Sequence, residues 1–138
     1  MLENREGQMV PQVTFRTRQD HEWVDVTTDD VFKGKTVIVF ALPGAFTPTC
    51  SNAHLPGFVV KSDELFAKGI DRIICLSVND AFVMAAWGEQ QHAEDRVMMI
   101  ADGNAEFHEV VLLFIQGAGI AAGQNQVIVL LEAVLIFL

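Results

Sequence analysis

Residues 36–50 read TVIVFALPGAFTPTC, and the expected fold follows from this stretch. Its first part, Thr36 to Ala41, is a continuous β-branched and apolar run, which is typical of a strand covered on both faces. A turn rich in proline and glycine comes next, and residues 50–69 then show helical spacing that is interrupted near Pro56 and stops at Gly69. We therefore expect a central strand, a loop, and a helix with Cys50 in its first turn.

The same alternation of strand and helix continues along the chain. Residues 22–27 alternate as a half-exposed strand would, and residues 28–34 supply cap-like and acidic side chains for a short helix. A second buried strand is expected at residues 72–78, a helix opened by Asn79 and Asp80 follows, and a third strand is expected at residues 97–101. This order predicts an α/β fold with a parallel sheet and right-handed crossovers. Function in such sheets usually lies at the carboxyl ends of the strands, which here is the loop after Ala41.

Composition and charge exclude several classes of protein. The chain has 138 residues, of which 51% are hydrophobic and 20% charged, so it can form a folded core and is not disordered. The formal net charge of −9 repels phosphate backbones, and nucleic acid is not an expected partner. The apolar runs at residues 110–115 and 127–138 are both shorter than the roughly 18 to 20 residues that span a bilayer, so no membrane role is expected.

Cysteine usage and the N-terminus bear on the compartment. Two cysteines, Cys50 and Cys75, cannot form the multi-bridge framework of small secreted domains. The first ten residues, MLENREGQMV, are polar and acidic, unlike a secretory signal or a transit peptide. These features predict a cytoplasmic protein.

The loop after the central strand holds the residues that can do chemistry. Main-chain N–H groups and the positive end of the helix dipole favour the thiolate of Cys50, which is the nucleophilic form of cysteine. The hydroxyl of Thr47 can reach toward the sulfur or a bound oxygen, while Pro43 and Pro48 stiffen the turn. From these residues alone, a buried structural cysteine that caps a helix remains the alternative.

A family resemblance favours the reactive cysteine. The string PGAFTPTC places Pro43, Thr47 and Cys50 in the spacing Pro-x-x-x-Thr-x-x-Cys and resembles the active-site loop of peroxiredoxins, specifically of the peroxiredoxin-5 type. Three segments, TVIVFALPGAFTPTCSNAHLPGF, IICLSVNDAFVMAAWG and ADGNAEF, follow the family in order, and the resemblance covers about residues 9 to 107. The N-terminal part, VPQVTFRTRQ…WVDVTTDD, resembles the bacterial peroxiredoxins that are fused to a glutaredoxin domain.

The resemblance implies a thioredoxin-like fold and a thiol peroxidase that reduces hydrogen peroxide and alkyl hydroperoxides. Cys50 would be the peroxidatic residue and would become a sulfenic acid. Thr47 would hydrogen-bond the peroxide, Pro43 would shield the thiolate from solvent, and main-chain N–H groups from Ala45 to Cys50 would stabilise the developing charge. Neither a metal nor another cofactor is expected.

Regeneration of the sulfenic acid requires a second thiol. The segment IICLSV places Cys75 in a buried strand, so an inert structural role is favoured over a resolving one. We therefore expect an external reductant, which the resemblance identifies as glutathione with a glutaredoxin, or thioredoxin. The resemblance also implies a homodimer.

After Phe107 the sequence departs from the family pattern. We expect residues 1–107 to form the peroxiredoxin-like domain and residues 108–138 a divergent apolar segment that leaves the C-terminal end of the fold incomplete or altered. Family members carry an active-site arginine in this region, but no arginine follows Arg96 here. Its loss removes a charge-assisted interaction of about 1.5 to 3 kcal/mol. The alternative function is therefore a catalytically impaired remnant that acts as a non-enzymatic redox-sensitive or interaction module.

Weaker signals receive structural interpretations. Residues 117–122 match G-x-G-x-x-A, but the acidic residue of a dinucleotide site is not at the required distance. His54 lies four residues after Cys50 and could support the thiolate, although a packing or surface role is favoured. Phe82, Met84 and Trp87 have the helical spacing of core residues.

Overall fold

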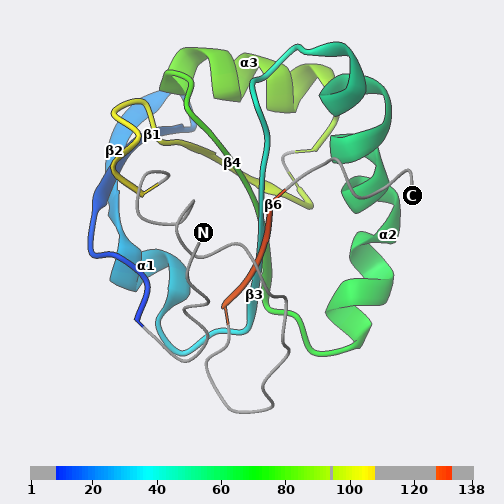
Figure 1. Cartoon of the computed structure of the whole chain (residues 1–138), viewed down its shortest axis with the longest axis horizontal. Coiled ribbons are helices and arrows are strands. Elements are labelled where there is room, and N and C mark those ends of the chain that lie inside the picture. The colour runs from blue at the N-terminus through cyan, green and yellow to red at the C-terminus, as the bar shows by residue number, and fades with distance from the viewer. Residues whose placement is uncertain (1–8, 94, 108–126, 132–138) are drawn as a thin grey trace, which may run out of the picture.

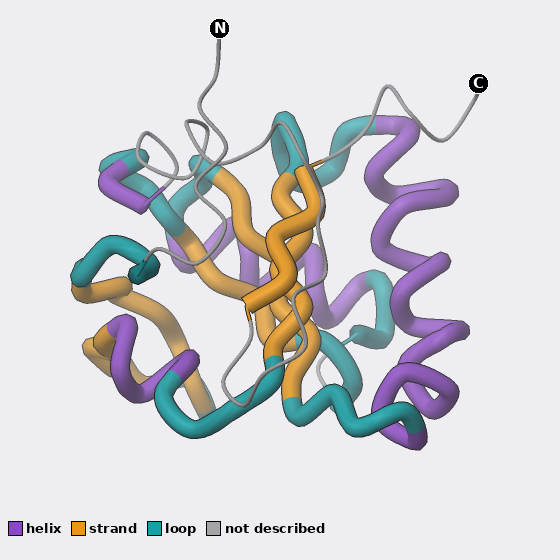
Figure 2. The backbone as a smooth tube through the Cα atoms, turned by 60° about the horizontal axis from the view of Figure 1, so that its bottom comes forward, coloured by secondary structure: helices purple, strands orange, loops and turns teal. Residues whose placement is uncertain are grey.

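The computed structural model describes residues 9–93, 95–107 and 127–131. Helices and a β-hairpin pack around a central sheet (Figures 1 and 2). The strands are β1 (Thr14–Gln19), β2 (Glu22–Thr27), β3 (Val37–Ala41), β4 (Arg72–Ser77), β5 (Met98–Ala101) and β6 (Val127–Leu131). The helices are α1 (Thr28–Phe32), the π-helix η1 (Cys50–His54), α2 (Leu55–Ala67) and α3 (Ala81–Gln90).

The four-stranded sheet has the order β5-β4-β3-β6, and every neighbouring pair is parallel. Strand β3 is paired on both sides, with Val37 opposite Arg72 of β4 and Val127 of β6, and all five of its residues are buried. The predicted central strand and parallel sheet are therefore confirmed. A continuous β-branched run suits this place because it packs against neighbours on both faces.

The two faces of the sheet carry two separate cores. One face packs against the β1–β2 hairpin and α1, and the other packs beneath α2 and α3. Figure 1 shows the hairpin and α1 on one side and α2 on the other, with α3 across the top. Alternate residues of β3 supply the two cores, Val37, Val39 and Ala41 to the first and Phe40 to the second. Both cysteines belong to the second core.

Strand β1 is the described strand that the sequence reasoning did not predict. It pairs antiparallel with β2, with Thr14 opposite Thr27 and Gln19 opposite Glu22. Its inward positions, Phe15 and Thr17, are buried, while the other four positions are more exposed. Only two of its six positions are buried, which makes the apolar signal too weak to identify the strand without its partner.

The cap predicted at Asp80 is confirmed, whereas the N-cap of α1 is Thr27, one residue before the predicted cap-like segment. Thr27 and Asp30 form a reciprocal capping box at α1, which confirms the structural role expected of the acidic residues there. The side chain of Asp80 accepts a hydrogen bond from the Val83 N–H at 2.9 Å and caps α3.

One core prediction is wrong. Met84 and Trp87 of α3 are buried, as expected, but Phe82 is 57% exposed. It lies at the start of α3 and packs edge-to-face on Trp23 of β2, with the ring centroids 5.0 Å apart. Helical spacing alone did not separate the two faces of α3 because its hydrophobic residues occur all around the helix.

The segment after Phe107 is described only at β6. This strand comes from the apolar run predicted at residues 127–138, and it joins the sheet beside β3. Residues 117–122 lie outside the described residues. Among the helices that the structure describes, none has both the length and the apolar character needed to cross a membrane.

Candidate active site

Cys50 lies at the carboxyl end of the central strand, as predicted. The chain leaves β3 at Ala41, turns through residues 42–47, and becomes helical at Pro48. The first main-chain bond into this helix is donated by the Ser51 N–H to the Thr47 carbonyl, at 3.0 Å. The amides of Thr49 and Cys50 come before that bond, so they point out of the amino end of the helix. A thiolate or a developing oxyanion is stabilised at such a position.

The helix widens at Cys50. Residues Cys50–His54 form the π-helix η1, in which the Leu55 N–H bonds the Cys50 carbonyl five residues earlier. Pro56 follows immediately, and in a regular α-helix its ring would clash with the carbonyl four residues earlier. The wide turn accommodates the proline without ending the helix, so the interruption expected near Pro56 is a change of pitch.

The two cysteine side chains are both buried in this structure. Cys50 is 2% exposed and packs in the core beneath α2 and α3, while Cys75 of β4 is fully buried. Burial, and to a lesser degree the nearby Cys50, raise the pKa of the Cys75 thiol well above its ordinary value. The interpretation of Cys75 as a residue of a buried strand is confirmed, and its neutral thiol is a poor nucleophile.

Thr47 and Pro43 lie on the same loop as Cys50. The Thr47 hydroxyl donates to the Gly44 carbonyl at 2.8 Å and thereby closes the turn. Its oxygen keeps lone pairs that can accept a further hydrogen bond. Pro43 is exposed on the loop. The structure thus places all three predicted site residues in one loop and helix start, with the Thr47 proton held by the loop itself.

Asn79 is a site residue that the sequence reasoning missed, because Asn79 was interpreted only as part of a helix start. Its side-chain oxygen Oδ1 accepts hydrogen bonds from the Ala45 N–H at 2.9 Å and from the Ser77 hydroxyl at 2.8 Å. The Ala45 N–H is therefore engaged within the protein, and the role expected of the main-chain N–H groups from Ala45 to Cys50 stays a prediction.

Aromatic residues frame the loop on the side of α3. Phe46 is half exposed and has a positive φ of 64°, a backbone conformation that is uncommon for bulky residues. Its ring lies 6.4 Å from that of the buried Trp87. The Trp87 indole Nε1–H donates to the Ser51 hydroxyl at 3.0 Å and so ties α3 to the π-helix.

His54 has the packing role that the sequence favoured. It is buried, and its ring lies 4.9 Å from that of Phe40 and 5.7 Å from that of Phe58. No group of three or more potential metal-ligating side chains occurs in the part of the chain that the structure describes.

The arginines of the described residues make their recorded contacts away from this loop. Arg16 and Arg18 stack on Trp23, and Arg72 donates to the Val31 carbonyl at 3.1 Å. Arg96 pairs with Asp63 of α2 and is exposed, so its interpretation as a surface residue is confirmed.

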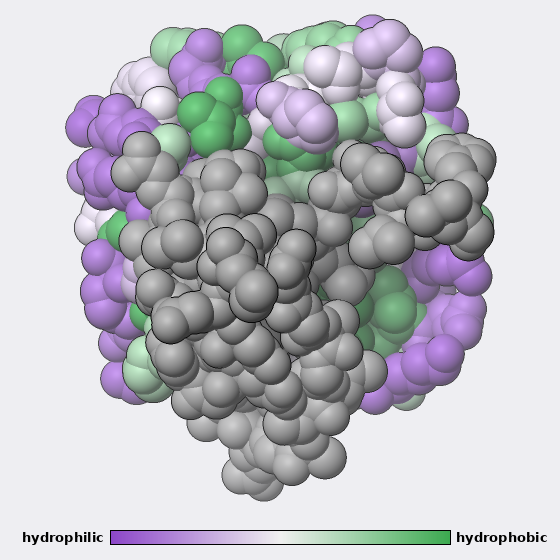
Figure 3. Space-filling view, in the orientation of Figure 1, coloured by the Kyte–Doolittle hydropathy of each residue, from purple (hydrophilic) through white to green (hydrophobic). Residues whose placement is uncertain are grey.

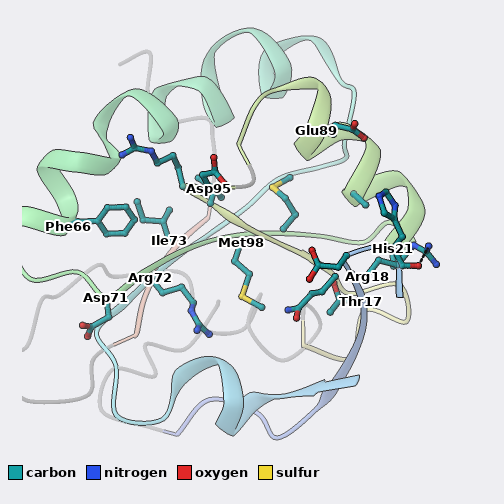
Figure 4. A pocket seen from close by; sticks show the side chains of 17 residues that line it. Thr17, Arg18, His21, Phe66, Asp71, Arg72, Ile73, Glu89, Asp95 and Met98 are labelled. Atoms are coloured by element: carbon teal, nitrogen blue, oxygen red, sulfur yellow. Dashed lines mark hydrogen bonds between the residues drawn. The ribbon is translucent and has the colours of Figure 1, made fainter. Parts of the chain in front are cut away.

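A pocket beside the edge strand β5 is separate from the cysteine loop. Figure 4 shows Asp71 just before β4, Arg72 at its start, Met98 from β5, and Arg18 and His21 from the hairpin around this hollow. Cys50, Thr47 and Pro43 do not line it. Basic and acidic side chains both line the pocket, and this mixture favours no single class of ligand.

The described surface on the face seen in Figure 1 is mixed in character. Figure 3 shows hydrophilic side chains along both flanks of this face, including the flank over α2. The exposed large hydrophobic side chains of the described residues are Met9, Trp23, Phe46, Val60, Val78 and Phe82.

Comparison with known proteins identifies the family. The family model described as Redoxin matches residues 5–128, and thus runs past Phe107 into β6. The chain belongs to the redoxin family. Its relatives are peroxiredoxins, as the loop motif predicted. A hybrid peroxiredoxin, hyPrx5, from Haemophilus influenzae is 55% identical over 108 residues, which are 78% of this chain and 44% of that protein.

Other peroxiredoxins match in the same way. Peroxiredoxin sll1621 from Synechocystis is 45% identical over 125 residues, which are 84% of this chain and 66% of that protein. The solved structure of reduced Prx3 from Vibrio vulnificus in complex with hydrogen peroxide is 49% identical, has a TM-score of 0.71, and is aligned over 80% of this chain and 68% of its own. The thioredoxin-like fold and the Prx5 type are therefore confirmed. The chain spans about half the length of the curated relatives it matches.

Proposed function

We propose that this chain is a thiol peroxidase that reduces hydrogen peroxide and alkyl hydroperoxides through Cys50. The observation that carries the proposal is the position of Cys50 in the first turn of a helix at the carboxyl end of the central parallel strand, within a peroxiredoxin sequence. The similar Prx3 structure was solved in complex with hydrogen peroxide, which supports this class of substrate.

The reaction is a displacement at oxygen. The Cys50 thiolate donates an electron pair to the nearer peroxide oxygen, the S–O bond forms, and the O–O bond breaks. Sulfur is oxidised by two electrons to a sulfenic acid, and the other oxygen leaves as hydroxide or alkoxide and takes up a proton to give water or an alcohol. The amides of Thr49 and Cys50 and the oxygen of Thr47 are the groups that we assign to holding the peroxide. We assign shielding of the thiolate to Pro43.

Regeneration then requires an external thiol. The thiol attacks the sulfenic acid, water leaves, and a mixed disulfide forms; a second thiol displaces Cys50 from it. The burial and raised pKa of Cys75 oppose a resolving role for that residue. We propose glutathione with a glutaredoxin, or thioredoxin, as the reductant. Both cysteines are free thiols, which fits a reducing compartment such as the cytoplasm.

The second candidate is a catalytically impaired remnant that acts as a redox-sensitive or interaction module. It is favoured by the sequence, in which no arginine follows Arg96, and by the pairing of Arg96 with Asp63 on α2. A guanidinium beside the sulfur would hold both the thiolate and the peroxide. Without it, we expect a reaction roughly 10 to 100 times slower than one with the arginine present.

Trapping of the sulfenic acid tests these two functions. The reduced chain is mixed with one equivalent of hydrogen peroxide and a sulfenic-acid probe, and the labelled peptide is identified by mass spectrometry. We expect rapid labelling confined to Cys50, no labelling in Cys50→Ser, and unchanged labelling in Cys75→Ser. Slow labelling that is shared between the two cysteines would instead support the remnant.

A further inference from the structure

We propose that Asn79 is a positioning residue for the reaction at Cys50, because its side-chain oxygen fixes the loop that carries the peroxide-binding groups. This inference rests on the proposed peroxidase function. It concerns a residue outside the motif Pro43–Cys50, on the connection between β4 and α3.

The geometry joins three segments at one oxygen. Asn79 Oδ1 accepts the Ala45 N–H at 2.9 Å and the Ser77 hydroxyl at 2.8 Å. The same hydroxyl lies 3.2 Å from the Leu42 carbonyl, and its single proton is better placed for the shorter contact. Ser77 is fully buried at the end of β4, so the anchor of this network belongs to the rigid sheet.

The network extends to the next strand. The Asp102 N–H donates to the Ser77 carbonyl at 2.9 Å, and the Leu42 N–H donates to the Leu76 carbonyl at 3.2 Å. The carboxyl ends of β3, β4 and β5 are thereby held together where the cysteine loop begins. The Asn79 side chain connects this part of the sheet to the cysteine loop through its hydrogen bond with Ala45.

The loop needs such a restraint. Phe46, the residue after Ala45, has a φ of 64°, and a bulky residue in this left-handed conformation is strained. Strained conformations persist only where the surroundings over-determine them. The Ala45 N–H and the Gly44 carbonyl belong to one peptide unit, so Asn79 and the Thr47 hydroxyl together hold the peptide between Gly44 and Ala45, one residue before Phe46.

The consequence for the reaction is one of placement. The Thr47 carbonyl accepts the first main-chain bond of the helix that carries Cys50, so a movement of the loop also moves the helix start. A displacement of about 1 Å in such groups can cost up to a hundredfold in rate. We assign Asn79 an indirect role, which it exerts through Ala45 and the turn.

Hydrogen exchange and peroxide kinetics together test the role of Asn79. In Asn79→Ala, we expect the Ala45 amide to exchange about tenfold faster or more, while amides of the β3–β4 ladder keep their protection. The second-order rate of Cys50 oxidation by hydrogen peroxide should fall about tenfold. Asn79→Asp keeps an acceptor oxygen at the same place, so it should restore protection of the Ala45 amide.

Asn104→Ala is the matched control. Asn104 is exposed in the turn after β5, and its side-chain amide contacts only Glu106 among the recorded bonds, at 3.4 Å. We expect neither the exchange of Ala45 nor the peroxide rate to change in this variant.

Each outcome supports or overturns the inference. Unchanged exchange at Ala45 in Asn79→Ala contradicts the clamp, and faster exchange with an unchanged peroxide rate contradicts the positioning role. Loss of protection throughout the β3–β4 ladder would show a general structural role instead, and would also overturn the proposal. A wild-type chain that fails to react with peroxide refutes the proposed function, while the exchange result separately decides whether Asn79 holds the loop.

Discussion

At the scale of single residues, the two cysteines differ in their surroundings. Cys50 stands where a strand turns into a helix, and Cys75 lies in the middle of β4 with a neighbouring strand on each side. Desolvation penalises a charged thiolate in the second position, which is why the pKa of Cys75 is raised. One chain therefore holds a candidate nucleophile and an inert thiol in the same core.

The raised pKa of Cys75 predicts a loss of stability at alkaline pH. Above about pH 8.5 an exposed thiol ionises, so the unfolded chain loses the Cys75 proton while the folded chain retains it. The unfolded state then binds fewer protons, and the free energy of unfolding falls by up to about 1.4 kcal/mol per pH unit from this group. Urea unfolding of the wild type and of Cys75→Ala is measured at about pH 7, 8 and 9. It gives the dependence of the free energy of unfolding on pH for each protein.

Cys75→Ala supplies the comparison because it removes this titrating group and leaves the others in place. Its stability at neutral pH should be lower than that of the wild type, since a small cavity remains. Its decline above about pH 8.5 should be shallower. Parallel declines in the two proteins would contradict the assignment of a raised pKa to Cys75.

At the scale of helices and strands, close packing between α3 and β5 limits the size of the residue at position 88. Gly88 faces β5, and a Cβ atom built there would lie 2.8 Å from the Met99 Cγ. Gly57 of α2, in contrast, is exposed, and a Cβ atom there would meet nothing within 4 Å. Packing against Met99 therefore requires a glycine at position 88, whereas no steric contact requires one at position 57.

Alanine substitutions distinguish these two positions. Gly57→Ala should stabilise the protein by about 0.5 to 1 kcal/mol, because alanine loses less backbone entropy in a helix. Gly88→Ala gains the same helix propensity but overpacks the Met99 side chain, and we expect a net loss of about 1 kcal/mol. Urea unfolding curves give both values.

A double variant tests the cause of the second effect. Met99→Ala removes the atoms that the new Cβ would meet, so adding Gly88→Ala in that background should no longer destabilise. An equal loss in both backgrounds would show that the contact between Gly88 and Met99 is not responsible.

At the scale of the whole molecule, an exposed aromatic pair among the described residues bridges the hairpin and α3. Trp23 and Phe82 are both exposed and pack edge-to-face, and the guanidinium of Arg18 lies 5.1 Å from the Trp23 centroid and 4.8 Å from that of Phe82. Large exposed apolar patches mark surfaces that contact other proteins, and this pair is the candidate contact that we test. The family resemblance implies a homodimer, and we propose that the dimer forms through this surface.

We expect the chain to sediment as a dimer at micromolar concentration and Phe82→Lys to shift it toward the monomer, because a charge at the interface resists desolvation. Val60→Lys, at an exposed position of α2, is the control and should leave the assembly unchanged. Sedimentation velocity measures the two states, and circular dichroism verifies that both variants fold. A monomeric wild type, or a dimer that persists in Phe82→Lys, would contradict the assignment of this surface.

Local sequence patterns determined most of the described fold and the main site residue. The apolar run Thr36–Ala41 predicted β3, and the spacing of Pro43, Thr47 and Cys50 predicted the loop and the family, because both are short-range signals. The boundary between residues 1–107 and 108–138 stays a prediction, although β6 lies beyond it and pairs with β3.

Tertiary structure alone decided three features. Strand β1 is recognisable only through its pairing with β2, and Phe82 lies on the exposed side of α3, where its ring packs against Trp23 of the hairpin. The role of Asn79 depends on Ala45, which lies 34 residues earlier in the chain. Contacts across such separations leave no local pattern, since their geometry exists only after the strands have assembled into a sheet.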